Sequence, residues 1–103
     1  MKITDITTQL IYSDCGRKWT HVFVHTDEGL TGIGEGTYSR KEAVVAEMVR
    51  DIKQYIIGRD PLDAESIYNF LYHGSRTGYS TGGVMFTSAI SGIDQALWDL
   101  KGK

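Results

Sequence analysis

The pattern of apolar and polar residues changes its period about one third of the way along the chain. In the first part the two kinds alternate, as in half-buried strands, over Ile3–Tyr12, Trp19–Thr26 and Leu30–Thr37. The second stretch alternates most clearly and predicts one shared face for Thr20, Val22, Val24 and Thr26. Asp27–Gly29 has the length and the glycine of a hairpin turn. The sequence therefore predicts a three-stranded antiparallel meander.

This meander predicts that two of the connecting segments lie together. Ser13–Lys18 joins the first strand to the second, and Gly36–Ser39 follows the third. Because the strands alternate in direction, both segments leave the same edge of the sheet, and the Asp27–Gly29 turn lies at the far end. A ligand that contacts the longer connections would be contacted at this edge.

In the second part, apolar residues recur every three or four positions, as on one face of an α-helix. Ser39 and Glu42 have the spacing of a capping box, and Gly58 is a typical helix terminator. The first helix is therefore predicted from this box to about Ile57. Its predicted inward residues are Val45, Met48, Val49, Ile52, Tyr55 and Ile56.

A second helix is predicted to begin at Asp60-Pro61, with aspartate as the N-cap and proline in the first helical position. It would reach about His73, with Ile67, Phe70 and Leu71 as its core. Gly74–Gly83 holds four glycines in ten residues and is a predicted loop.

Val84–Lys103 has the strongest helical pattern in the chain. Its predicted buried stripe consists of Phe86, Ala89, Ile90, Ile93, Leu97 and Leu100. Gly92, with Ser88 and Ser91, would let another backbone approach, and Gly102 would end the helix in the left-handed conformation. Because the sequence stops here, we expect a domain cut at an element boundary. Strands followed by helices, about three of them, predict an α+β fold.

Composition narrows the classes of protein that fit. The chain has 103 residues, 41% apolar and 23% charged, which suits one ordinary globular domain. A net charge of −2 argues against a nucleic-acid partner, and the single cysteine allows no internal disulfide. No apolar run is long enough to span a membrane, and no signal-peptide core is present. A cytoplasmic location is the expectation.

Two motifs resemble parts of functional sites, but the sequence gives each functional interpretation little support. Gly32-Ile-Gly34-Glu-Gly36 resembles part of a dinucleotide-binding pattern, but the third glycine is replaced by Thr37, and glycines that ease a twisted strand are the better interpretation. His21 and His25 share one strand face and could begin a metal site, yet no third ligand is evident.

Several single residues are further candidates. Asp94 and Asp99 are five residues apart on a helix, so they diverge and are better explained by capping or salt bridges. Cys15 lies beside cationic residues that favour its thiolate, but no base accompanies it. Arg76 and Tyr79 are a second, weaker set for ligand contact.

Four stretches carry a family resemblance: 27–36 (DEGLTGIGEG), 58–61 (GRDP), 71–74 (LYHG) and 88–103 (SAISGIDQALWDLKGK). In order and spacing they resemble the N-terminal capping domain of the enolase superfamily, in its mandelate racemase/muconate lactonizing group. The nearest likeness is to galactonate-dehydratase-like sugar-acid dehydratases. In that family the domain precedes a (β/α) barrel with the metal-binding carboxylates and acid/base residues, and that barrel is absent from residues 1–103.

The resemblance implies a Mg²⁺-dependent acid-sugar dehydratase, in which these residues cap the substrate and bind no Mg²⁺ themselves. Alone, they are expected to be inactive and to carry no catalytic residue. The implied partners are an acid sugar, the protein's own C-terminal barrel and further copies in a homo-oligomer. A racemase, epimerase or cycloisomerase of the same superfamily and a stand-alone interaction module remain alternatives.

The resemblance also implies which residues contact substrate. In the family, the loop after the first strand and the segment after the third close over the barrel mouth. Arg17, Lys18, Trp19 and Tyr38 are therefore the candidate substrate-binding residues. Cationic side chains suit a sugar-acid carboxylate. The alternative is a solvated charged loop with Trp19 packed on the sheet.

Overall fold

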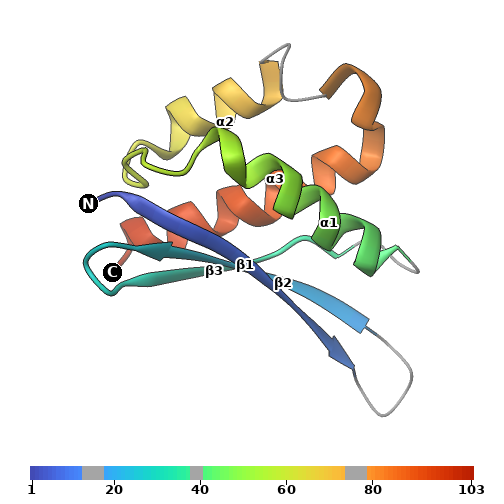
Figure 1. Cartoon of the computed structure of the whole chain (residues 1–103), viewed down its shortest axis with the longest axis horizontal. Helices are drawn as coiled ribbons and strands as arrows, with labels where there is room; N and C mark the ends of the chain where they lie inside the picture. The colour runs from blue at the N-terminus through green and yellow to red at the C-terminus, as the bar shows by residue number, and fades with distance from the viewer. Residues whose placement is uncertain (13–17, 38–40, 74–78) are drawn as a thin grey trace.

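The structure, a computed structural model, describes residues 1–12, 18–37, 41–73 and 79–103, with the backbone alone described for 73 and 79–85. Its sheet consists of β1 (Ile3–Tyr12), β2 (Lys18–Thr26) and β3 (Thr31–Glu35), antiparallel in the order β1-β2-β3. The helices lie together on one side of this sheet, and the outer ends of β1 and β2 extend past them (Figure 1). The α+β class and the meander are confirmed.

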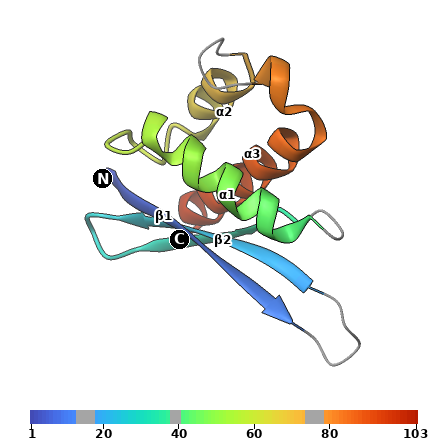
Figure 2. The ribbon, with the colours of Figure 1, turned by 45° about the vertical axis from the view of Figure 1, so that its right-hand side comes forward.

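The helical part consists of α1 (Glu42–Ile52), the short 3-10 helix η1 (Lys53–Tyr55), α2 (Ala64–His73) and α3 (Tyr79–Lys101). A second view shows α3 between α2 and the sheet, with α1 crossing above β1 and β2 (Figure 2). None of these helices, in the part of the chain that the structure describes, is long and apolar enough to cross a membrane.

The alternation of β2 is confirmed, because Thr20, Val22, Val24 and Thr26 are all buried beneath the helices. The Thr26 N–H donates to the Leu30 carbonyl at 3.1 Å and so closes the predicted turn. Gly29 has a φ of +79°, a conformation that side chains with a Cβ rarely adopt.

One core joins both layers. The predicted α3 stripe is fully buried, and the sheet contributes Ile3, Ile6, Val22 and Val24 to the same cluster. Helices α1 and α2 add Val45, Val49, Ile52, Ala64, Ile67 and Leu71. Phe70, predicted as core, is only half-buried, and the Arg59 guanidinium lies 5.2 Å from its ring centroid.

The first helix differs from its prediction at both ends. It begins at Glu42, and Lys41 occupies the N-cap position without a side-chain cap, whereas Ser39 lies outside the described residues. At the other end the helix tightens into η1, and Gly58 then reverses the chain with a φ of +92°. The prediction that Gly58 ends the helix is therefore wrong, because the helix ends before it, and the left-handed Gly58 belongs to the turn that follows.

The predicted start of the second helix at Asp60-Pro61 is wrong. The Asp60 carboxylate accepts the Leu62 N–H at 2.9 Å, and its carbonyl accepts the Asp63 N–H at 3.1 Å. These bonds close a turn, a structure in which Asp and Pro are both common. Helix α2 begins four residues later, at Ala64.

The ends of the third helix also need correction. Helix α3 begins at Tyr79 and includes Gly82 and Gly83, so the predicted loop to Gly83 is too long. Each glycine costs only about 1 kcal/mol in a helix, a penalty that a long helix can absorb. Gly102 does not take the left-handed conformation, because its φ is not positive, although its N–H donates to the Trp98 carbonyl at 3.1 Å.

The glycines on β3 and just after it have a packing role. A Cβ built on each would collide with the α3 backbone: Gly32 meets Ala96, Gly34 meets Gly92 and Gly36 meets Ser88. The contacted helix residues are four apart, a rise of about 6 Å, and the glycines are two apart, a rise of about 6.6 Å. The near match of these steps lets α3 lie directly on the strand, which confirms the predicted close approach at Gly92.

Candidate functional site

The predicted substrate edge lies where β1 ends and β2 begins. Tyr12 pairs with Lys18 and Ile11 with Trp19, so the strand ends that flank the first long loop stand side by side. Lys18 is exposed, and its ammonium lies 5.3 Å from the centroid of the Tyr12 ring. Trp19 is half-buried on the sheet face opposite the helices.

The segment that follows β3 meets the same edge. The Gly36 N–H donates to the Thr20 carbonyl at 3.0 Å, and the Thr20 N–H donates to the Thr37 hydroxyl at 3.2 Å. Thr20 is two residues from Lys18. The convergence predicted from the meander is therefore confirmed for the described ends of the two segments.

The start of α1 is tied to this edge as well. The buried Thr20 hydroxyl donates to the Glu42 carbonyl at 3.2 Å, across 22 residues of sequence. Sequence reasoning missed Thr20 and Thr37 as positioning residues, because a threonine in a strand normally signals only strand propensity. Together, Thr20 and Thr37 fix the positions of the start of β2, the segment at the end of β3 and the first turn of α1 relative to one another.

The structure describes only part of the predicted site. Arg17 and Tyr38 lie outside the described residues, as do Cys15 and Arg76. Tyr79 is placed by its backbone as the first residue of α3. What the structure brings together at the edge is one exposed cation, Lys18, with the aromatic ring of Tyr12, whereas Trp19 faces the other side of the sheet. An exposed ammonium suits an anionic ligand.

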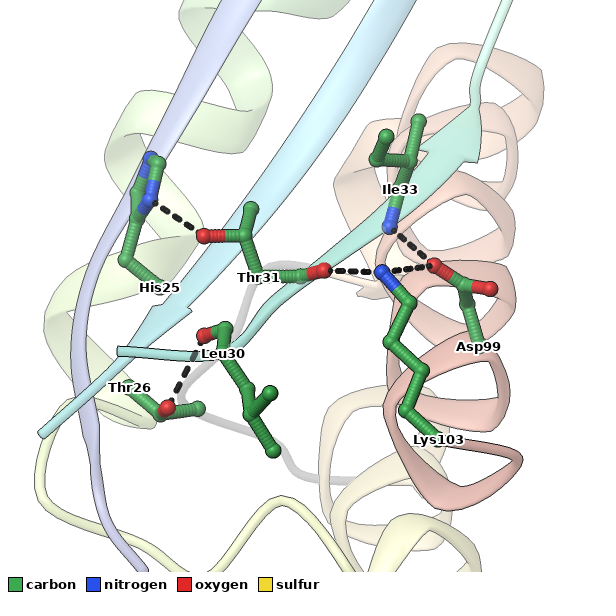
Figure 3. Close-up of polar contacts among 7 residues, drawn as sticks. All are labelled: His25, Thr26, Leu30, Thr31, Ile33, Asp99 and Lys103. Carbon is green, nitrogen blue, oxygen red and sulfur yellow. Dashed lines mark hydrogen bonds and ion pairs between the residues drawn. The ribbon is translucent and has the colours of Figure 1, made fainter. Parts of the chain in front are cut away.

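His25, on the bare sheet face, is in contact with the strands on both sides of it. The His25 ring contacts the Thr7 hydroxyl at 2.8 Å and the Thr31 hydroxyl at 3.3 Å, one on each neighbouring strand (Figure 3 shows the latter). Within residues 1–12, 18–37, 41–73 and 79–103, no group of three or more His, Cys, Asp or Glu side chains is placed to hold a metal ion. The sheet-face interpretation of His25 fits the observed contacts.

Asp94 and Asp99 have separate environments, as their spacing predicted. The Ile33 N–H, at 3.0 Å, and Lys103 hold the pKa of the Asp99 carboxyl below its ordinary value. Partial burial raises the pKa of Asp94, against a hydrogen bond from Trp98 that acts in the opposite direction. The predicted salt-bridge role is confirmed for Asp99, which lies 3.3 Å from the Lys103 ammonium.

Asp99 belongs to a row of side chains, from α3 and the residue pair after it, that covers the outer edge of β3. The Gln95 amide accepts the Glu35 N–H at 3.1 Å and donates to the Glu35 carbonyl at 3.0 Å. The Lys103 ammonium donates to the Thr31 carbonyl at 2.6 Å, beside the bond from Ile33 to Asp99 (Figure 3). We call these three residues, Gln95 and Asp99 of α3 and Lys103 just after it, the β3 edge row.

Comparison with known proteins places the chain in a family. The family described as "Mandelate racemase / muconate lactonizing enzyme, N-terminal domain" matches residues 13–103. A D-galactonate dehydratase of Pectobacterium atrosepticum is 42% identical over all 103 residues, and the chain spans about a quarter of that relative's length.

Solved structures agree with this match. A member of the enolase superfamily from Salmonella Typhimurium is 35% identical, with a TM-score of 0.87 over 98% of this chain and 26% of its own. The 3,6-anhydro-D-galactonate cycloisomerase from Zobellia galactanivorans is 33% identical, with a TM-score of 0.83 over 99% of this chain and 28% of its own. The sheet, the helices laid on it and these matches along the whole chain agree, and the chain belongs to the enolase superfamily, as an N-terminal domain of its mandelate racemase/muconate lactonizing group.

Proposed function

We propose that this domain caps the active site of an acid-sugar dehydratase and helps to select its substrate. The observation that carries the proposal is the match, without a gap in coverage, to D-galactonate dehydratases over all 103 residues at up to 42% identity. In the complete protein, a C-terminal barrel would supply the reacting groups. The edge that joins the first long loop to the segment after β3 would lie over the substrate.

The chemistry of this edge supports the proposal. Lys18 offers an exposed ammonium to a sugar-acid carboxylate, and its cross-strand neighbour Tyr12 is 65% exposed. Arg17 and Tyr38 adjoin the described ends of the same two segments. A charge-assisted hydrogen bond to the carboxylate would fix the position of the α-carbon. Closure of the loops would exclude water from it.

The proposed reaction removes the proton α to the carboxylate and the hydroxyl on the β-carbon, so that one water leaves and a 2-keto-3-deoxy acid forms after tautomerisation. The resemblance adds Mg²⁺, which would supply charge stabilisation in the barrel. The described residues of this chain do not fit such an ion, because they hold no cluster of carboxylate or imidazole ligands. We therefore assign this chain binding, orientation and water exclusion, and no proton-transfer step.

A second candidate reaction is supported by one comparison. The similarity to a 3,6-anhydro-D-galactonate cycloisomerase, at 33% identity, shows that this domain type also accompanies isomerases. An isomerising enzyme, including a racemase or epimerase, would share the removal of the α-proton but would retain the atoms of water.

The test uses the full-length protein with D-galactonate and related acid sugars, in buffer containing Mg²⁺ and in D₂O. A dehydratase forms a 2-keto-3-deoxy acid, detected as its semicarbazone, and loses this activity when EDTA removes the metal. Exchange of the α-proton for deuterium without loss of water would favour the isomerase instead. If the full-length protein catalyses neither on any acid sugar of the panel, the proposed function is wrong.

A further inference from the structure

The ends of β1 and β2 that form the candidate substrate edge extend past the helices (Figure 1). Toward this edge, the last buried residue of β1 is Ile6, and the last buried residue of β2 is Thr20. Tyr12 and Lys18, at the strand ends themselves, are exposed. On these two strands, Thr20 is therefore the buried residue nearest to Lys18.

All the polar groups of Thr20 join this strand end to the rest of the fold. Its carbonyl accepts the Gly36 N–H at 3.0 Å, and its N–H donates to the Thr37 hydroxyl at 3.2 Å. Its hydroxyl donates to the Glu42 carbonyl at 3.2 Å. Only this last bond depends on the Thr20 side chain, so a substitution can remove it alone.

The groups that bond with Thr20 are themselves held against the helices. A Cβ on Gly36 would lie 2.8 Å from the Ser88 carbonyl oxygen, so the end of β3 is in close contact with the backbone of α3. Glu42 is buried and is the first residue of α1. Thr20 therefore links the projecting strand ends to both α1 and α3.

Lys18 depends on this link for its position. Its described contacts are the pairing with Tyr12 and the approach of its ammonium to the Tyr12 ring, and that ring is itself exposed. Residues two apart in a strand lie on the same face, about 6.6 Å from each other along the strand. A displacement of Thr20 would therefore displace Lys18 as well.

We propose that Thr20 is a positioning residue for substrate binding, because its hydroxyl bond to Glu42 holds Lys18 where the ammonium meets the substrate carboxylate. This inference rests on the proposed function, which makes an acid sugar the ligand of Lys18. Thr20 is buried and acts through Lys18, without a contact to the substrate. A purely structural threonine would affect stability and leave KM unchanged.

A second threonine on the same face of β2 provides the matched control. Thr26 is also buried, and its hydroxyl donates to the Leu30 carbonyl at 2.8 Å, at the opposite end of the sheet. Valine is β-branched like threonine and favours strands, so Thr20→Val and Thr26→Val each remove one bond from a hydroxyl to a carbonyl. Both substitutions should lower the melting temperature of the full-length protein.

Steady-state kinetics with the acid sugar that the full-length protein turns over should separate the two variants. Thr20→Val is expected to raise KM by roughly 10- to 100-fold, since a misplacement of about 1 Å can cost about 100-fold. Its kcat should change less, because the carboxylate contact contributes to binding. Thr26→Val should have the wild-type KM, and Thr20→Ser, which retains the hydroxyl, should restore KM. If Thr20→Val does not fold, Thr37→Val removes the neighbouring bond and should raise KM in the same way.

Two further measurements identify the route. If Thr20 acts through Lys18, Thr20→Val should have little further effect on KM in a Lys18→Ala background. Hydrogen exchange of the full-length protein needs no substrate. Exchange should be faster in Thr20→Val than in the wild type for peptides that include Lys18 or Gly36, and Thr26→Val should leave these peptides unchanged.

The possible failures are distinguishable. An unchanged KM in Thr20→Val, an equal rise in Thr26→Val, or additive effects of Thr20→Val and Lys18→Ala would each overturn this inference. Unchanged hydrogen exchange in Thr20→Val would overturn it even in a protein that turns over no acid sugar. Absence of turnover would overturn the proposed function and with it the assigned ligand of Lys18, whereas the exchange result would still show whether Thr20 holds Lys18 in place.

Discussion

Gly34 on β3 lies so close to the carbonyl oxygen of Gly92 on α3 that it cannot carry a side chain without displacing the helix backbone. A Cβ on Gly34 would collide with the Gly92 oxygen, and a Cβ on Gly92 would lie 3.1 Å from the Gly36 nitrogen. The two elements are 58 residues apart in sequence, and this contact sets the distance between the helix layer and the sheet.

Substitution of Gly34 by alanine should therefore destabilise the fold. The added methyl group meets backbone, which cannot rotate away, so the helix or the strand must shift. Overpacking of this kind typically costs about 1–3 kcal/mol. Urea unfolding, followed by tryptophan fluorescence, should show a lower midpoint for Gly34→Ala with an unchanged slope.

Gly102→Ala is the control for this prediction. A Cβ there would make only ordinary contacts, the nearest at 3.6 Å to the Asp99 carbonyl, and the residue does not have a positive φ. Its midpoint should be unchanged or slightly higher, because alanine favours a helix over glycine. Equal effects of the two substitutions would mean that the close approach at Gly34 does not limit stability.

Asp99 should make stability depend on pH in the acid range. Its folded-state pKa lies below the ordinary value of 3.8, so the unfolded chain binds the proton more tightly. The stabilisation from Asp99 is therefore complete above the unfolded pKa and is lost as pH falls through the folded pKa. Thermal melts between about pH 7 and pH 2 should show a shallower acid-side decline for Asp99→Asn than for the wild type.

Asp94 should have the opposite effect on stability in the same experiment. Burial raises its folded-state pKa, so the folded chain binds this proton more tightly than the unfolded chain does. Asp94 therefore disfavours folding above its folded pKa, and Asp94→Asn should raise the melting temperature at neutral pH. A lower melting temperature for Asp94→Asn at pH 7 would show instead that the charged Asp94 makes a stabilising contact, even though burial raises its pKa.

The candidate substrate edge predicts a kinetic effect without a structural one. If Arg17 or Lys18 pairs with the substrate carboxylate, its replacement by alanine removes a charge-assisted hydrogen bond of roughly 1.5–3 kcal/mol. In the full-length enzyme, kcat/KM should fall by about 10- to 150-fold, at 1.36 kcal/mol per decade. Melting temperatures should barely change, because exposed substitutions usually alter stability by less than about 0.5 kcal/mol. Wild-type kcat/KM in both variants would show that the loop does not contribute to substrate binding.

The chain of residues 1–103 should not bind Mg²⁺ tightly by itself. Calorimetric titration into this chain is expected to show no stoichiometric site at millimolar concentration, whereas the full-length protein should show one. Two of the described carboxylates are already paired, Asp5 with Lys53 and Asp99 with Lys103, and the described residues place no three metal-ligating side chains together. A tight site on the short chain would move the metal from the barrel to this domain.

The fold is most predictable from the sequence where a pattern of side chains has only one structural explanation. Alternation in β2 and the stripe of α3 both report burial directly, and the buried residues are those predicted. Ends of elements are less predictable, because the same residues suit competing local structures. Asp60-Pro61 can cap a helix or close a turn, and the hydrogen bonds to Leu62 and Asp63 show that the turn is formed.

The candidate site is predictable in its position but not in its supporting contacts. The meander alone brings the long loops to one edge, since strand direction fixes where each loop emerges. The bonds of Thr20 to Thr37 and to Glu42 could not be predicted, because they join residues 17 and 22 positions apart. From the sequence, the glycines of β3 are best interpreted as easing a twisted strand, because nothing near them in the sequence indicates the helix that lies on them.

The β3 edge row has a consequence for association between molecules. The row occupies backbone groups that a strand added on that side would need. Such a strand would have to displace Gln95, Asp99 and Lys103 before it could pair with β3. The row therefore protects this edge of the sheet from the pairing with other chains that leads to aggregation.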